Sequence, residues 1–180
     1  MGSIRRYRQG DEPTKNLSGK STRVNHELEP IFHQNSEILI LGSIPSVKSR
    51  EEKFYYAHPQ NKFWKILAEV YNEKTPSTIK EKQEFLERKH LALWDVIKSC
   101  TITGSSDSSI KEVIPNNINN IIDKSNIRKI YTTGKTAYHL YNKYIYETTK
   151  IEAIYLPSTS PANASISYQK ILEAYKQIKE

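Results

Sequence analysis

Cysteine is almost absent from this sequence, since Cys100 is the only one among 180 residues. One cysteine cannot form an intrachain disulfide, and it excludes a zinc or iron–sulfur site built from several cysteine ligands. Long apolar runs are also missing: none approaches the roughly 18 residues of a membrane span, and no signal-peptide core is visible. We therefore expect a cytoplasmic protein with no membrane partner. The sequence also offers no cluster of metal-ligating residues, and we expect neither a metal nor an organic cofactor.

Glycine is scarce, at 6 residues, and the glycine-dependent fingerprints of nucleotide-binding proteins are missing. Gly134-Lys135 lacks the GxxxxGK[ST] spacing of a phosphate loop, and GSIPS at 42–46 is not GxGxxG. Both absences disfavour a small-nucleotide-binding α/β module.

Acidic residues are outnumbered, with 27 Lys and Arg against 20 Asp and Glu, for a net charge of +7. Such a balance favours a polyanionic partner such as DNA. Residues 1–22 are polar and basic and predict a flexible tail, which acts either as an electrostatic arm on DNA or as a solvated leader. Residues 23–180 are long enough for a single domain with its own core. We expect this domain to be monomeric.

Apolar runs and helical periodicities alternate along the rest of the chain. Strands are expected at 38–41, 91–97, 127–132 and 151–156, and helices at 61–71, 77–89 (capped by Ser77), 116–124, 135–148 and 167–179. A polar loop is expected at 101–109. This alternation predicts an α/β fold with a parallel sheet covered on both faces. Right-handed crossovers bring the loops after the strands to one edge, where such sheets bind ligands.

The loop after the first strand is dense in aromatic and amide side chains. Tyr55, Tyr56, His58 and Asn61 there suit a flat, hydrogen-bonding ligand such as a nucleobase. Each has a plainer interpretation: the tyrosines could be core, His58 a loop histidine, and Asn61 a helix N-cap.

Two other segments carry polar groups suited to a site. Asp95 at a strand end and Asp107 in a serine-rich loop could each be a catalytic carboxylate or a turn residue. The loop 157–165 contains two prolines and several small hydroxyl and amide side chains. It is stiff and low in profile, so its hydroxyls and N–H groups can approach a phosphate backbone closely.

Four segments in order resemble the uracil-DNA glycosylase superfamily, and within it the hypoxanthine-DNA (deoxyinosine) glycosylase branch. They are ILILGSIPSVKS from Ile38, YYAHPQNKFWKIL from Tyr55, LWDVIKSC with GSSDSSI from Leu93, and LPSTSPANA from Leu156. The resemblance implies a three-layer α/β/α sandwich on a short, mainly parallel four-stranded sheet. It implies a monofunctional DNA repair enzyme that hydrolyses the N-glycosidic bond of a flipped-out deaminated base and leaves an abasic site.

Two departures from related motifs shape the expected specificity. Where mismatch-specific uracil glycosylases carry a catalytic Asn in GINPG, this chain has Ile44, and its Ser160-Pro161-Ala162 lacks a motif histidine. Deoxyinosine is therefore the expected substrate. The alternatives are a uracil or mismatch-specific glycosylase and a catalytically silent damaged-DNA binder.

The resemblance and the loop composition together assign candidate roles. The catalytic candidates are Asn61, His58 and Ser160, with Asn61 orienting the attacking water. The base-binding candidates are Gly42, Ser43, Ile44, Tyr55 and Tyr56. The DNA-binding candidates are Lys48, Lys53, Lys62, Ser158, Thr159, Pro161 and Asn163.

Overall fold

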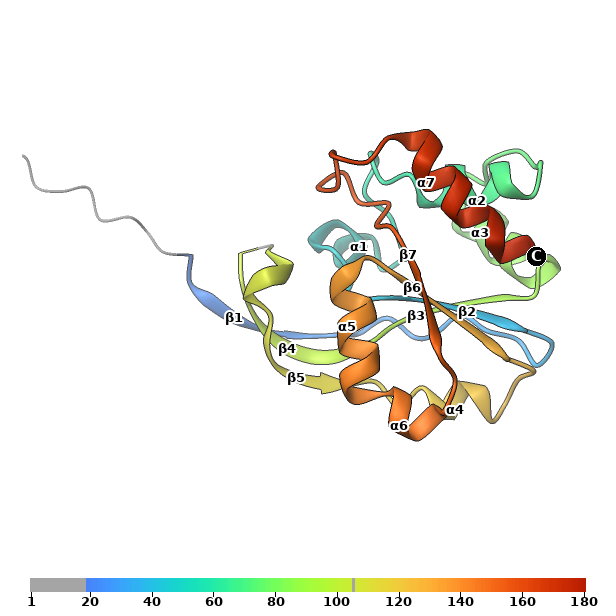
Figure 1. The fold of residues 1–180 in the computed structure, drawn as a ribbon. Helices are drawn as coiled ribbons and strands as arrows, with labels where there is room; N and C mark the ends of the chain where they lie inside the picture. Colours follow the sequence, from blue (N-terminus) through green and yellow to red (C-terminus); the bar gives the residue numbers. More distant parts are fainter. Residues whose placement is uncertain (1–18, 105) are drawn as a thin grey trace, which may run out of the picture.

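A parallel four-stranded sheet forms the centre of the protein in a computed structural model that describes residues 19–104 and 106–180. Its strands in spatial order are β3 (Leu91–Asp95), β2 (Ile38–Gly42), β6 (Lys129–Thr133) and β7 (Ala153–Leu156). All pairings between them are parallel (Figure 1). The four strands and their direction confirm the fold predicted from the sequence.

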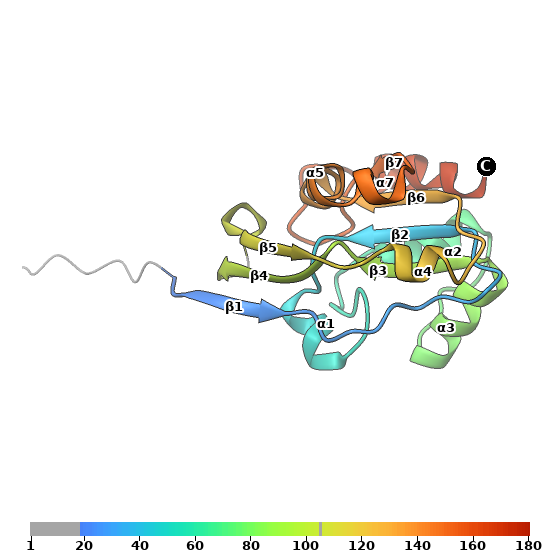
Figure 2. The same ribbon diagram turned by 90° about the horizontal axis from the view of Figure 1, so that it is seen from below.

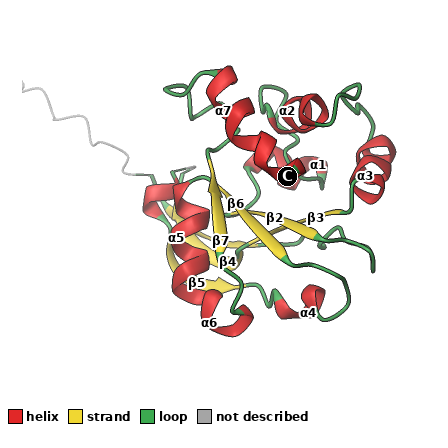
Figure 3. Cartoon of the chain, turned by 45° about the vertical axis from the view of Figure 1, so that its right-hand side comes forward, coloured by secondary structure: helices red, strands yellow, loops and turns green. Residues whose placement is uncertain are grey.

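The sheet is apolar on both faces, as buried parallel strands must be. Ile40 and Leu93 point to one core, which α2 (Phe63–Val70), α3 (Ile79–Arg88) and α7 (Tyr168–Tyr175) cover. Leu39 and Leu41 point to the opposite core, because neighbouring residues of a strand face opposite ways. The elements on that side include α4 (Asn119–Ile122), α5 (Lys135–Tyr144) and α6 (Tyr146–Thr149), so helices lie on both sides of the sheet (Figure 3).

A second, antiparallel sheet was not predicted. It consists of β1 (Ser21–Asn25), β4 (Ile97–Thr103) and β5 (Lys111–Pro115), in the order β1-β4-β5 (Figure 2). Its inner residues Val24, Cys100 and Ile102 pack into the same core as Leu39 and Leu41. The prediction of one strand over 91–97 and a loop over 101–109 is therefore wrong in part. The outer face of this sheet is mostly polar, although Ile114 is exposed on it, and this hid the sheet from a search for apolar runs.

Several boundaries also differ from those predicted. β1 begins two residues before the predicted domain boundary at 22/23, while residues 1–18 of the predicted tail lie outside the described residues. The predicted helix 135–148 is divided at Ile145 into α5 and α6. The cap of α3 is Thr78, in a capping box with Glu81, rather than Ser77. A short helix α1 (Val47–Glu52) and the 3-10 turns 107–109 and 176–179 were not predicted.

The chain crosses from one sheet to the other at Val96, directly after β3. The backbone N–H of Val96 donates to the Gly42 carbonyl (2.9 Å), and that of Ile97 donates to the Ser43 carbonyl (3.0 Å). These bonds tie the start of β4 to the end of β2. The side chain of Asp95 is thereby held at the carboxyl edge of the parallel sheet, next to Gly42.

Within the described residues, no helix has the length and apolar character needed to cross a membrane.

Candidate functional site

A cleft of about 820 Å³ opens at the carboxyl ends of the parallel strands. The loops after β2, β6 and β7 line it together with Asp95 at the end of β3. It contains most of the predicted site residues, namely Gly42, Ser43, Ile44, Lys48, Tyr55, Tyr56, His58, Asn61, Ser158, Thr159, Ser160, Pro161 and Asn163. The topology thus gathers segments that are more than a hundred residues apart in the sequence.

Two of the predicted DNA-binding lysines do not line this cleft. Lys53 lies on a separate hollow of about 1110 Å³ between residues 23–33 and the helices α1 and α3. Lys62 precedes α2, and its backbone N–H donates to the Thr159 carbonyl (3.1 Å). Lys48 lines the cleft, where it also forms an ion pair with Glu52 (2.8 Å).

The two adjacent tyrosines have different environments. The ring of Tyr55 is only 4% exposed, and its hydroxyl donates to the Glu29 carbonyl (2.7 Å), so it is a core residue and the predicted stacking role does not suit it. Tyr56 has a left-handed backbone (φ 52°), which turns its ring toward the cleft side of β2. Its ring stacks on Phe63, with 3.8 Å between the centroids.

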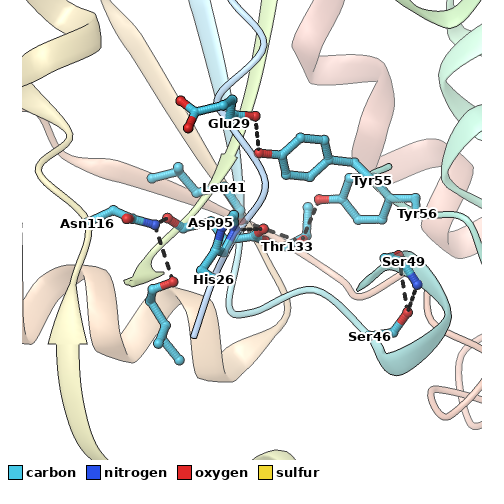
Figure 4. A network of polar contacts seen from close by, with 11 residues as sticks. His26, Glu29, Leu41, Ser46, Ser49, Tyr55, Tyr56, Asp95, Asn116 and Thr133 are labelled. Atoms are coloured by element: carbon cyan, nitrogen blue, oxygen red, sulfur yellow. Dashed lines mark hydrogen bonds and ion pairs between the residues drawn. The ribbon is translucent and has the colours of Figure 1, made fainter. Parts of the chain in front are cut away.

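The hydroxyl of Tyr56 points toward Thr133, and the two oxygens lie 3.4 Å apart (Figure 4). Burial, with a further contribution from the Asp95 carboxylate, raises the pKa of Tyr56. The phenol is therefore neutral and remains a hydrogen-bond donor at physiological pH.

Asn61 lies one residue before the N-cap of α2, Lys62, whose own side chain makes no capping bond, so the predicted N-cap is displaced by one residue. The catalytic interpretation of Asn61 stays a prediction. Its Oδ1 accepts hydrogen bonds from the Phe63 N–H (2.9 Å) and from the Thr159 hydroxyl (2.9 Å). Because an N–H can donate only to the oxygen, the first bond fixes which end of the amide is which. The oxygen thus caps the start of α2 and is fully occupied, which leaves the NH₂ as the end of Asn61 that can act on a ligand.

Thr159 was predicted to contact DNA, and the structure contradicts this for its side chain. Thr159 is 1% exposed, and its hydroxyl is the second donor to Asn61. Its role is to hold Asn61 from the loop after β7, a contact across 98 residues of sequence. No local pattern in the sequence indicated this pairing.

The remaining loop residues are arranged by bonds among themselves. The Ser158 hydroxyl accepts from the Ser160 N–H (3.1 Å), and the Asn163 side chain donates to the Ser158 carbonyl (2.9 Å). His58 accepts a hydrogen bond at Nδ1 from the Gln60 N–H (3.1 Å). Pro161 is exposed at the rim. These bonds shape the edge of the cleft that the loop forms.

A buried polar pair lies at the floor of the cleft. His26 Nε2 and Asp95 Oδ2 are 2.6 Å apart, and their side chains are 1% and 6% exposed. The other carboxylate oxygen, Oδ1, lies 2.5 Å from where a Cβ would be on Gly42. Gly42 is therefore required because the carboxylate occupies the space of a side chain. The sequence identified Asp95 only as one of two candidate carboxylates and gave no signal for His26, 69 residues away.

Asp107, the other candidate carboxylate, lies on an exposed 3-10 turn at the rim of the cleft. No group of three or more His, Cys, Asp or Glu side chains suited to a metal ion occurs within residues 19–104 and 106–180.

Comparisons with known proteins agree with this architecture. Residues 30–179 match the family model described as the Uracil DNA glycosylase superfamily. A Methanosarcina barkeri protein named hypoxanthine DNA glycosylase is 35% identical over 108 residues, which cover 59% of this chain and 68% of that protein. A Methanosarcina acetivorans protein of the same name is 33% identical over 141 residues, which cover 76% of this chain and 87% of that protein.

A solved structure is also similar. The solution NMR structure of a Methanosarcina acetivorans protein, described as a candidate uracil DNA glycosylase, superimposes with a TM-score of 0.74 at 27% identity. The match covers 88% of this chain and all of that one.

Proposed function

Because the chain belongs to the uracil DNA glycosylase superfamily and is a DNA glycosylase, we propose that its substrate is deoxyinosine, the deamination product of deoxyadenosine. The enzyme hydrolyses the N-glycosidic bond of the flipped-out nucleotide, releases hypoxanthine and leaves an abasic site. The observation that carries the proposal is the Asn61 amide, held in the cleft by Phe63 and Thr159, with its NH₂ end free of those bonds. The names of the curated relatives support hypoxanthine as the base.

A base must leave the helical stack before it can enter such a cleft. Flipping costs a few kcal/mol, and the cost is least for a damaged or mispaired base, which favours deaminated nucleotides. The half-buried ring of Tyr56 supplies an aromatic edge at the floor of the cleft, backed by Phe63. The 158–165 loop, with Pro161 at the rim, is placed to hold the duplex open. The net charge of +7 and Lys48 favour binding of the phosphates.

Hydrolysis requires only a weak nucleophile, because the sugar passes through an oxocarbenium-like transition state. The Asn61 NH₂ can donate to the oxygen of a water molecule and orient it against C1′ without removing its proton. The departing purine gains negative charge and needs donors aimed at it. The backbone N–H groups of Ser43 and Ile44 and the Ser160 hydroxyl are the candidates in this cleft. The role of His58 stays a prediction.

The proposal is tested with the purified protein and a duplex carrying one deoxyinosine. Free hypoxanthine should appear together with an abasic site that breaks only after alkali treatment. Duplexes carrying uracil and xanthine, run in parallel, measure the base preference. Release of uracil alone would favour the uracil alternative, and tight binding without release at stoichiometric enzyme would favour a silent damage binder. A monomeric state and a cytoplasmic location also remain predictions.

A first variant tests the support of Asn61. Thr159→Val keeps the shape of the buried side chain but removes the donor to Asn61 Oδ1, while the Phe63 N–H bond remains. We expect the single-turnover rate on deoxyinosine to fall about tenfold, because the amide can then rotate away from its productive orientation. Thr22→Val on the exposed strand β1 is the matched control. Equal rates in both variants would remove Thr159 from the mechanism.

A further inference from the structure

Asp95 has one carboxylate oxygen that the fold leaves available to a ligand. Oδ2 is bonded to His26, whereas Oδ1 accepts no hydrogen bond from the described residues. Oδ1 is also not among the fully buried polar atoms that lack a partner, which are Arg50 Nε, Trp94 Nε1 and Thr132 Oγ1. Asp95 lines the cleft, so this oxygen, on a side chain 6% exposed, opens into it.

We propose that Asp95 Oδ1 is the acceptor that recognises the ring N–H of the deaminated purine, and that His26 is the positioning residue that keeps this carboxylate correctly oriented. The inference rests on the proposed function and deepens it by naming the groups that select the base. His26 directly follows β1 and precedes the family-matched segment 30–179, so part of the proposed base-selecting unit lies outside that segment.

The chemistry of the bases explains why a carboxylate acceptor distinguishes hypoxanthine from adenine. Hypoxanthine carries a proton on N1 and an acceptor at O6, whereas adenine carries a lone pair on N1 and a donor at N6. A carboxylate accepts only, so it pairs with N1–H of hypoxanthine and repels the N1 lone pair of adenine. A Cβ built on Gly42 would lie 3.5 Å from the neutral Tyr56 hydroxyl and 2.5 Å from Asp95 Oδ1. A hydrogen-bond donor therefore lies beside the Asp95 acceptor. A base that leaves these polar groups without hydrogen-bond partners binds much more weakly.

His26 is needed because the carboxylate is removed from water. A buried carboxylate oxygen without a hydrogen-bond partner is unfavourable, so loss of the His26 bond would favour rotation of the Asp95 carboxylate. A rotated Asp95 would no longer present Oδ1 to N1–H. The 2.6 Å bond between His26 Nε2 and Asp95 Oδ2 keeps Oδ2 occupied (Figure 4). Oδ1 then faces Gly42, 2.5 Å from the position that a Cβ would take there. Asn116 fixes the same turn by donating to the Asp95 carbonyl (2.9 Å).

The test compares deoxyinosine with deoxynebularine, a purine nucleotide that lacks both N1–H and O6. In single-turnover assays, Asp95→Asn should slow excision of deoxyinosine about a hundredfold. It should not slow excision of deoxynebularine, because the N1 lone pair of that base no longer faces a carboxylate. A parallel loss on both substrates would mean a structural role and would overturn the inference. Inactivity of the wild type on deoxyinosine would instead overturn the proposed function.

Inhibition by products provides a second readout that does not depend on slow substrates. The concentration of free hypoxanthine that halves activity should rise at least about tenfold in Asp95→Asn, whereas inhibition by abasic-site DNA should not change. Unchanged inhibition by hypoxanthine would contradict the inference.

Variants of His26 test the positioning role. His26→Leu should lower the deoxyinosine rate at least about tenfold and lower the ratio of deoxyinosine to deoxynebularine excision with it. His26→Gln retains a donor and should restore that ratio to within about threefold of the wild type. His139→Leu, at an exposed histidine of α5, is the matched control. An unchanged ratio in His26→Leu would exclude His26 from base selection.

Discussion

Asn61→Asp should leave the protein folded and yet lower single-turnover excision of deoxyinosine by at least about a hundredfold, or roughly 2.7 kcal/mol of barrier. One carboxylate oxygen can accept the bonds from the Phe63 N–H and the Thr159 hydroxyl, as the amide oxygen does now. Aspartate is as good as asparagine at the start of a helix, so stability should be retained. The NH₂ donor, however, is replaced by an anionic acceptor that no longer orients water in the same way.

A comparison of Asn61→Ala with Asn61→Asp separates the two functions of this side chain. It removes the cap as well as the donor, so it should lose about 1 kcal/mol of stability in addition to the activity. Thermal unfolding and single-turnover rates, measured below the unfolding transition, distinguish the contributions. Wild-type rates in both folded variants would transfer the water-positioning role to another residue, with His58 and Asp107 the next to examine.

Gly42→Ala should be nearly as damaging to activity, for a steric reason. The new Cβ would lie 2.5 Å from Asp95 Oδ1, closer than any normal contact. The carboxylate is held by its bond to His26, so the new methyl group must either turn the carboxylate and strain that bond or displace β2. We expect a stability loss of about 2 kcal/mol and at least about a hundredfold lower excision of deoxyinosine.

A double-mutant cycle identifies the cause of that loss. If the clash is with the carboxylate, Gly42→Ala should destabilise the Asp95→Ala background much less than the wild type, because the methyl group then occupies vacated space. Denaturant midpoints of the four proteins give the coupling free energy. Equal destabilisation in both backgrounds would place the clash elsewhere along β2.

The parallel sheet could be predicted from the sequence because its strands are buried on both faces. A run such as ILIL at 38–41 has no solvent-facing position, and it ends at Gly42 where a polar loop begins. The helices were recognised for a related reason, since α2 places six of its eight residues in the core. The antiparallel sheet lacked this signal, because β1 buries only Val24 of its five residues.

The loops of the site were also predictable, since their composition is unusual and they follow strands. The sequence could not predict which atoms of these side chains are free to contact a ligand. Asn61 has a local partner, Phe63, that the sequence indicates, and a distant one, Thr159, that it does not. Tyr55 and Tyr56 are adjacent and chemically identical, yet Tyr55 is 4% exposed with its hydroxyl bonded to the Glu29 carbonyl, whereas the half-buried Tyr56 has its hydroxyl next to Thr133.

The sequence by itself therefore determined the fold class, the family resemblance and the segments that meet at one edge of the sheet. Those properties depend on local hydrophobic patterns and on the fixed handedness of strand connections. Only the tertiary structure decided that His26 reaches Asp95 and that Thr159 reaches Asn61. Both contacts join residues far apart in the chain, and their geometry depends on how two sheets and a closing loop pack together.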